Sequence, residues 1–380
     1  MTAPPPGPFG PPPGWPGQSQ FGGYGYPPPY PVSPPIPGYP GYPGYPGNPG
    51  HPGNQGYPPP GYGHPGPGYP QPSYPGGTPW KPGIIPLRPL SLSDIFNGAV
   101  AYVRANPRAT LGMTTGVVLI TSALGLLIGH SAPPAASDVG MLAGVLTGAT
   151  AAVLATILLS GMLTVVVARA VQGIPITVGQ AWQRVRDRLP ALIALTLLEI
   201  LAVVVLIAAV VATIAVVART VDGAMAAVVG FPLVLLLIAA LAALFTLLSL
   251  APMAIVLERK SVTASIGRSV ALARPQFWRI FGIRLLASIV AVLVAGAVSV
   301  PFDIVGQVVS VDGGPEAPSL LQMTVVTIGQ AIGQIITTPF TAGVVVLLYV
   351  DARIRSEAFD FVLQSAPAHG IDPDTLWLSR

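Results

Sequence analysis

The chain has 380 residues, of which 51% are hydrophobic and only 8% are charged, with a formal net charge of +4. It contains no cysteine, which excludes a disulfide framework, a thiolate nucleophile and a zinc site with Cys ligands. Its basic residues are spread along apolar segments instead of forming one patch, which indicates membrane topology and no nucleic-acid partner.

Residues 1–83 are predicted to form a disordered tail rich in Pro, Gly and Tyr. No Asp, Glu, Lys or Arg precedes Lys81, and a Gly-Tyr-Pro unit repeats from Gly38 to Pro46. Proline removes backbone donors and fixes φ, while glycine raises chain entropy, so neither a helix nor a strand propagates. This composition leaves two functions open. The tail is either a solvated spacer or a segment whose tyrosines bind protein partners.

Six apolar segments of membrane-spanning length follow the tail. A helix of about 20 residues crosses a hydrocarbon core of about 30 Å. We therefore predict an all-α integral membrane protein with six transmembrane helices, arranged as three hairpins, in a membrane domain over residues 84–362. Residues 363–380 are predicted to form a short cytoplasmic tail. The predicted spans lie near residues 109–129, 140–168, 190–218, 231–257, 277–300 and 321–350.

The Lys and Arg residues predict how the spans are oriented. If the chain crosses the membrane six times, all 18 Lys and Arg residues except Arg219 fall on one side. Short basic loops resist translocation, so this side is predicted to be the cytoplasm. Arg219 lies in a tight outer turn beside Asp222, which balances its charge. We predict a multi-pass protein of the plasma (inner) membrane with both termini in the cytoplasm.

A short amphipathic helix is predicted before each hairpin, near residues 91–106, 177–189 and 261–274. Each begins at a hydroxyl residue suited to an N-cap, and its apolar residues follow helical spacing. Such helices suit the membrane interface, and their regular spacing favours a three-fold pseudo-repeat. The alternative is that basic inner loops are simply common in polytopic proteins. The three hydroxyl residues are Ser91, Thr177 and Ser261.

Several polar residues interrupt the predicted spans. Glu199 lies in the third span, and Arg284 lies in the fifth, from where it either reaches inward or extends toward the lipid headgroups. The sixth span carries a polar stripe at helical spacing. Either the stripe and Glu199 line a cavity, or Gln and Thr hydrogen bonds hold packed helices together. A single carboxylate favours packing. The stripe comprises Thr324, Thr327, Gln330, Gln334, Thr338 and Thr341.

Three ordered motifs connect the predicted membrane domain with a known family. They are Arg88-Pro89-Leu90 with Asn106-Pro107, Leu257-Glu258-Arg259 with Phe277-Trp278-Arg279, and Pro339-Phe340-Thr341 with Asp351, Arg353, Arg355 and Glu357. With these motifs, residues 86–362 resemble the membrane domain of the glycerophosphoryl diester phosphodiesterase family. With its tail, the chain resembles actinobacterial proline- and glycine-rich transmembrane proteins. The resemblance covers the membrane domain alone and implies no catalytic residues.

These features favour a non-catalytic protein without cofactor or metal. A phosphodiester hydrolase of that family would need a separate catalytic barrel with clustered His and carboxylates, whereas the four His of this chain are scattered. We expect a scaffold or envelope-organising role through the tail. The alternative is a carrier or flippase for a lipid or small solute that uses the polar residues of the spans. Expected partners are membrane lipids and, for the tail, proteins; the oligomeric state stays open.

Overall fold

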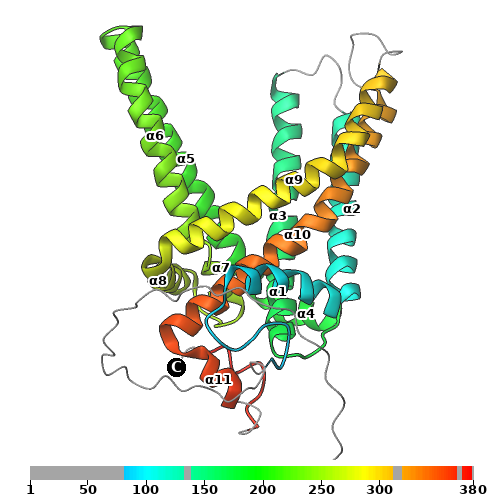
Figure 1. Ribbon diagram of the computed structural model, residues 1–380. Helices are drawn as coiled ribbons and strands as arrows, with labels where there is room; N and C mark the ends of the chain where they lie inside the picture. The colour runs from blue at the N-terminus through cyan, green and yellow to red at the C-terminus, as the bar shows by residue number, and fades with distance from the viewer. Residues whose placement is uncertain (1–80, 132–137, 311–318, 366–369, 379–380) are drawn as a thin grey trace, which may run out of the picture. The chain divides into compact units, whose positions relative to one another are not determined.

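The computed structural model describes residues 81–131, 138–310, 319–365 and 370–378, and over these residues the protein is all-helical (Figure 1). Six stretches are long and apolar enough to cross a membrane, which confirms the six predicted spans. Residues 1–80 of the predicted tail lie outside the described residues. The long helices are α2 (Pro107–Ser131), α3 (Asp138–Val171), α5 (Leu189–Thr220), α6 (Gly223–Leu248), α9 (Phe277–Ser310) and α10 (Leu320–Glu357).

The long helices pack as the three predicted hairpins, α2 on α3, α5 on α6 and α9 on α10. Helix α10 is central to the bundle, since it also contacts α1, α2 and α3. The second half of α10 is buried, with Val344, Leu347 and Tyr349 each fully inaccessible. A helix that is apolar on all sides in this way belongs in the interior of a bundle.

Three short amphipathic helices precede the hairpins, as predicted. The side-chain oxygen of each predicted N-cap residue accepts a hydrogen bond from the backbone N–H three residues later, at 3.1 Å for Ser91, 3.4 Å for Thr177 and 3.5 Å for Ser261. Figure 1 shows the three helices at the same end of the long helices. They are α1 (Leu92–Ala105), α4 (Val178–Val185) and α8 (Val262–Ala273), and the 3₁₀ turns Arg186–Arg188 and Arg274–Gln276 follow α4 and α8.

The apolar face of α1 packs on α10 instead of facing lipid. Ala99 and Tyr102 are fully buried, and the Tyr102 hydroxyl donates a hydrogen bond to the carbonyl of Pro339. Gly343 permits this close approach, because a Cβ there would lie 2.5 Å from Tyr102 Cε1. The helix predicted for residues 91–106 is therefore present, and its apolar side packs on protein.

The segments that flank the membrane domain also pack against it. Ile84 donates its backbone N–H to Ala170 O at 3.2 Å, so the chain is held close to the predicted boundary at residue 83. A short helix, α11 (Phe359–Ser365), follows α10, and Trp377 beyond it is 3% exposed. Over its described residues, the segment predicted as a tail (363–380) is therefore packed. Its aromatic and aliphatic side chains supply apolar area that a free tail would leave in water.

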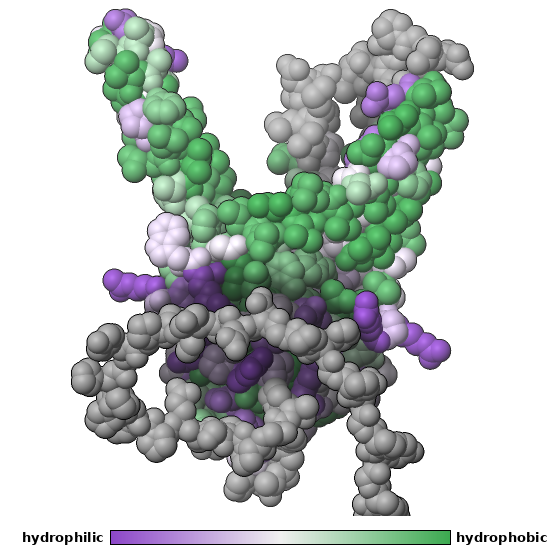
Figure 2. Space-filling model, viewed as in Figure 1, coloured by the Kyte–Doolittle hydropathy of each residue, from purple (hydrophilic) through white to green (hydrophobic). Residues whose placement is uncertain are grey.

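Apolar side chains on the long helices face outward. On the face shown in Figure 2, hydrophobic residues cover α5, α6 and α9, while hydrophilic residues gather near α8 and α11. Two of the outward-facing apolar residues are Leu201 of α5 and Leu236 of α6, which are 58% and 65% exposed. Trp278, at the start of α9, is 79% exposed, and an exposed Trp at a helix end is typical of a membrane–water interface. This surface is suited to hydrocarbon and identifies a multi-pass membrane protein.

Candidate intramembrane pocket at a broken helix

The fourth predicted span (231–257) is interrupted. Helix α6 ends at Leu248, and two turn residues follow. A second, short helix, α7 (Ala251–Val256), then leads to α8. Pro252 has no backbone N–H, so it cannot bond the carbonyl four residues earlier, and its ring disfavours a continuous helix. Non-helical backbone at membrane depth is tolerated only where protein buries it or where it lines a cavity. The groups freed by the break therefore require partners.

Two side chains from the third hairpin unit supply those partners. Ser269 of α8 donates its hydroxyl to Leu247 O at 2.5 Å and accepts from the N–H of Leu250 at 3.1 Å. Arg284 of α9 donates from Nη1 to Phe245 O at 2.5 Å. The Phe245 carbonyl is available because the N–H of Ser249, four residues later, donates to Thr246 O instead, at 3.4 Å. Ser269 is fully buried, so its two bonds hold the break in a dry environment.

A pocket of about 430 Å³ adjoins the break. Its walls come from α2, α3, α9, α10 and the residues around the break. Most of its lining is apolar, but one guanidinium, one carboxamide and several hydroxyls open into it. The polar side chains are Thr121, Thr156, Ser160, Thr164, Ser249, Arg284, Gln334, Thr338 and Thr341.

Arg284 is the strongest donor in this pocket. A guanidinium carries five N–H donors, and among the described residues Arg284 bonds only Phe245 O. The hydroxyls of Thr156 and Thr164 each donate to a carbonyl of their own helix, at 2.8 and 2.6 Å, and so present acceptor oxygens to the pocket. Among the described residues, Arg284 is thus a positive charge with unused donors, and the other residues that line the pocket are neutral, whereas Glu199 lies outside the lining. This chemistry suits an anion attached to an apolar body.

The structure brings together only two of the five polar residues singled out from the sequence. Arg284 and Gln334 line the pocket, as does the Thr338–Thr341 end of the same stripe. Thr327 and Gln330 lie nearer the start of α10 and outside the pocket lining; Gln330 is exposed and Thr327 is half-buried. Glu199 is half-buried on α5; it attracts Arg284 electrostatically without forming an ion pair with it.

Two glycines of α10 that flank the polar stripe have a separate role. Gly329 packs on the Phe302 ring and Gly333 on Ala295, so this side of α10 contacts α9. Gln330 and Gln334 remain exposed, which shows that the stripe does not hold that contact together. The packing interpretation therefore applies to the glycine side of α10 and not to the Gln side.

Sequence reasoning missed the break and the hydroxyls of α2 and α3. The local signal for the break is Ser249-Leu250-Ala251-Pro252. A Pro shortly after a Ser in an apolar run marks a site where a membrane helix can be interrupted. The hydroxyls of Thr121, Thr156 and Thr164 carry no distinctive signal, since isolated Thr and Ser are common in membrane helices.

A buried ionic cluster joins three segments that are distant in sequence. Asp351, 1% exposed, accepts from the N–H of Leu90 at 2.8 Å, from Arg279 Nε at 3.1 Å and from Arg355 Nε at 2.9 Å. The same two arginines donate to Leu90 O, at 2.6 and 3.1 Å. The carboxylate of Asp351 and the backbone N–H and carbonyl of Leu90 therefore hold the start of the domain, α9 and α10 together.

A second buried cluster lies where α7 leads into α8. Glu258, with a fully buried side chain, accepts from Arg268 Nε at 2.9 Å and from the Tyr349 hydroxyl. Arg268 also pairs with Glu357, which Arg353 contacts at 3.0 Å. Every acid here is neutralised by an arginine, which is the pattern of a structural network. In the part of the chain that the structure describes, no group of His and acidic side chains is arranged to hold a metal ion.

Residues 90–352 match a domain of unknown function, DUF7847. The chain belongs to this family. No curated protein and no solved structure matches the chain. The DUF7847 domain contains the broken helix, every residue of the pocket, and the acids Glu258 and Asp351 at the centres of the two clusters. Helix α11 and residues 370–378 lie beyond its last matched residue.

Proposed function

We propose that the DUF7847 domain is a non-catalytic binding domain that holds an anionic amphiphile, such as a phospholipid, in the pocket at the broken helix. The observation that carries this proposal is the Arg284 guanidinium, which lines a pocket between predicted spans and, among the described residues, donates only to Phe245 O. A charge at membrane depth is costly and marks a path or a ligand site. Discontinuous helices are a recurrent feature of substrate sites in transporters.

The size and lining of the pocket favour an amphiphile over a small inorganic ion. A volume of about 430 Å³ lies within the range of small-molecule sites. Val117, Leu159 and Val345 offer apolar contact beside the charge. A phosphate group on Arg284 with an acyl chain along these residues would satisfy both kinds of surface. This is the lipid carrier or flippase predicted as the alternative from the sequence, and the pocket gives it the stronger support.

The proposal includes an orientation. Pro252 and Met253 of α7, which leads into α8, line the pocket together with Arg284 of α9. Most Lys and Arg residues lie in or next to the segments that form α1, α4 and α8. Basic segments remain in the cytoplasm, so the pocket would draw lipid from the cytoplasmic leaflet of the plasma membrane. The resemblance to glycerophosphoryl diester phosphodiesterase membrane domains fits a membrane module without a catalytic barrel.

Replacing Arg284 by Gln is expected to weaken binding of phosphatidic acid by tenfold to about a hundredfold, because charge-assisted hydrogen bonds contribute about 1.5–3 kcal/mol. The measurement is native mass spectrometry of the purified protein with added phosphatidic acid or phosphatidylcholine. Arg284→Lys, which keeps the charge, should retain part of the affinity. Arg274→Gln is the matched control, since Arg274 is exposed and lies outside the pocket. Equal lipid binding by Arg284→Gln and the unaltered protein would contradict the proposal.

A second candidate function rests on the tail. The 80 residues before Lys81 carry no ionisable Asp, Glu, Lys or Arg and repeat Tyr among Pro and Gly, which suits weak multivalent binding of protein partners. A scaffold role predicts that deletion of residues 2–80 abolishes capture of partner proteins while lipid binding at Arg284 is kept. Unchanged partner capture and localisation after this deletion would remove the scaffold hypothesis.

A further inference from the structure

Two arginines of the DUF7847 domain hold a carboxylate that lies outside the domain. Arg169, in the last turn of α3, has a side chain that is 11% exposed, and Arg184 lies on α4. Arg184 donates to the two carboxylate oxygens of Asp374, from Nε at 3.2 and 3.3 Å and from Nη2 at 3.1 Å. Arg169 donates to the same carboxylate. A small pocket of about 40 Å³ at this point is also lined by Arg259, which is exposed.

Two arginines contact one carboxylate here, and Arg259 lines the same small pocket. Arginine forks bind carboxylate and phosphate with the same bidentate geometry, so a site built for one accepts the other. The domain match ends at residue 352, and Asp374 lies in the segment 370–378 beyond it. The domain thus presents a paired-arginine site whose resident anion is contributed by an adjoining segment.

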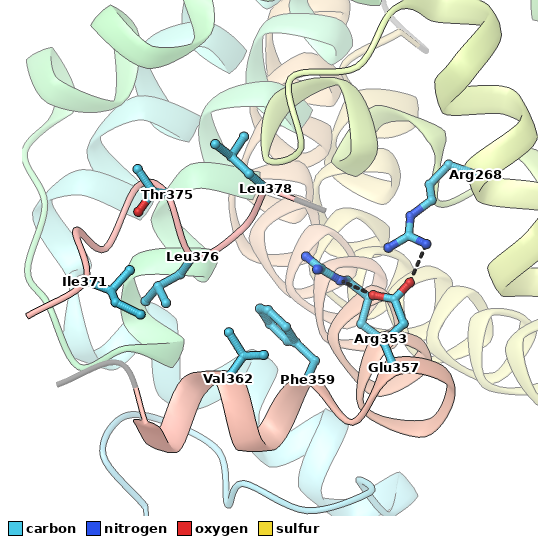
Figure 3. A pocket seen from close by; sticks show the side chains of 9 residues that line it. All are labelled: Arg268, Arg353, Glu357, Phe359, Val362, Ile371, Thr375, Leu376 and Leu378. Carbon is cyan, nitrogen blue, oxygen red and sulfur yellow. Dashed lines mark hydrogen bonds and ion pairs between the residues drawn. The ribbon is translucent and has the colours of Figure 1, made fainter. Parts of the chain in front are cut away.

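The segment that carries Asp374 also lines a pocket on another side. This pocket has a volume of about 420 Å³. Its lining includes Ile371, Leu376 and Leu378 of this segment and Phe359 of α11 (Figure 3). Leu376 and Trp377 of the segment are buried, at 8% and 3% exposed, so its release requires these contacts to be broken. Its remaining anchors include Gln172 Nε2 on Pro373 O at 3.1 Å and Arg353 Nη1 on Trp377 O at 3.0 Å.

We propose that Arg169, Arg184 and Arg259 form a binding site for a phosphate-type oxyanion and that Asp374 is its built-in competitor. When the oxyanion binds, Asp374 leaves the arginines and residues 370–378 are released as a latch. The oxyanion is either the headgroup of a phospholipid or free inorganic phosphate. This site is separate from the Arg284 pocket and shares no lining residue with it.

The charge state of Asp374 determines how the latch opens. Partial burial raises the pKa of its carboxyl, but the hydrogen bonds from Arg184 and the charge of Arg169 outweigh this and hold the pKa below its usual value. A carboxylate with a lowered pKa stabilises the folded state above its unfolded pKa of about 3.9 and loses that effect as the pH falls through the folded pKa. At neutral pH Asp374 is therefore ionised, and the latch opens by competition with another anion.

The test compares Asp374→Asn with the unaltered full-length protein in lipid nanodiscs. Removing the competing charge should raise the affinity for the oxyanion at least tenfold, measured by calorimetry with inorganic phosphate and by flotation with vesicles that contain phosphatidic acid. A gain with both probes indicates free phosphate chemistry, and a gain with vesicles alone indicates a lipid headgroup. Asp360→Asn on α11 removes an equal charge outside the site and should give no gain.

Further variants keep the test decisive. Deletion of residues 370–380 should give the same gain as Asp374→Asn, and addition of Arg169→Gln should abolish it. Arg284→Gln should leave the gain intact, which separates this site from the lipid pocket. The proposal is overturned if neither Asp374→Asn nor the deletion raises the affinity for either probe, or if the gain persists with Arg169→Gln.

Discussion

Replacing Asp351 by Asn is expected to lower the free energy of unfolding by about 3 kcal/mol, the lower end of the range for breaking a buried ion pair. Asp351 is 1% exposed and neutralises both Arg279 and Arg355. Without its charge, two guanidiniums remain near a buried amide. Both arginines are about one-third exposed, at 32% and 33%, so water can solvate part of each charge and the loss stays below the maximum.

The measurement for Asp351→Asn is chemical unfolding in detergent, followed by tryptophan fluorescence. Asp187→Asn is the matched control, because Asp187 is 76% exposed and pairs only with its neighbour Arg186 among the described residues. Such a surface pair contributes about 0–1 kcal/mol. If the two variants were equally stable, the Asp351 cluster would not be the junction between the Leu90 segment, α9 and α10.

The features predicted correctly from the sequence depend on local signals. Hydropathy alone sets the number of long helices, since each requires about 20 apolar residues. Ser91, Thr177 and Ser261 were found as N-caps because the hydroxyl and the N–H that it accepts from lie three residues apart. The hairpin pairing follows from the short connections between consecutive spans.

The features that escaped prediction depend on tertiary contacts. Pro252 sits in a run so apolar that the span reads as continuous, and the partners that stabilise the break, Ser269 and Arg284, come from other helices. Arg284 was recognised as a charge within a span, but its carbonyl partner on Phe245 could not be inferred. The polar stripe of α10 is longer than the pocket, which is why Thr327 and Gln330 were grouped with Gln334 although they do not line it.

Spacing motifs of glycine also need tertiary context. Gly112, Gly116, Gly125 and Gly148 form Gly-x-x-x-Gly patterns in the first hairpin, yet a Cβ at any of them would meet no atom within 4 Å. In contrast, Gly343 belongs to no such pair and lies against Tyr102. In a chain with 44 glycines, a Gly-x-x-x-Gly pattern does not identify where two helices approach closely; the tertiary contact at the glycine does.

The most direct test of the pocket is the access of water to it. The chain has no cysteine, so single Cys substitutions can be labelled one at a time with a charged, water-soluble thiol reagent. Thr338→Cys and Thr121→Cys place the thiol in the pocket, whereas Ile336→Cys and Leu293→Cys place it on outward-facing apolar surface. Only a thiol in contact with water forms the reactive thiolate.

We predict that the two pocket thiols react with the reagent and are protected when phosphatidic acid is added, while the two outward-facing thiols stay unlabelled in lipid. Because labelled and unlabelled protein differ in mass, the extent of reaction can be read by mass spectrometry for each variant. Pocket thiols as unreactive as Ile336→Cys and Leu293→Cys, or labelled pocket thiols that phosphatidic acid leaves unprotected, would contradict a polar lipid-binding pocket at the broken helix.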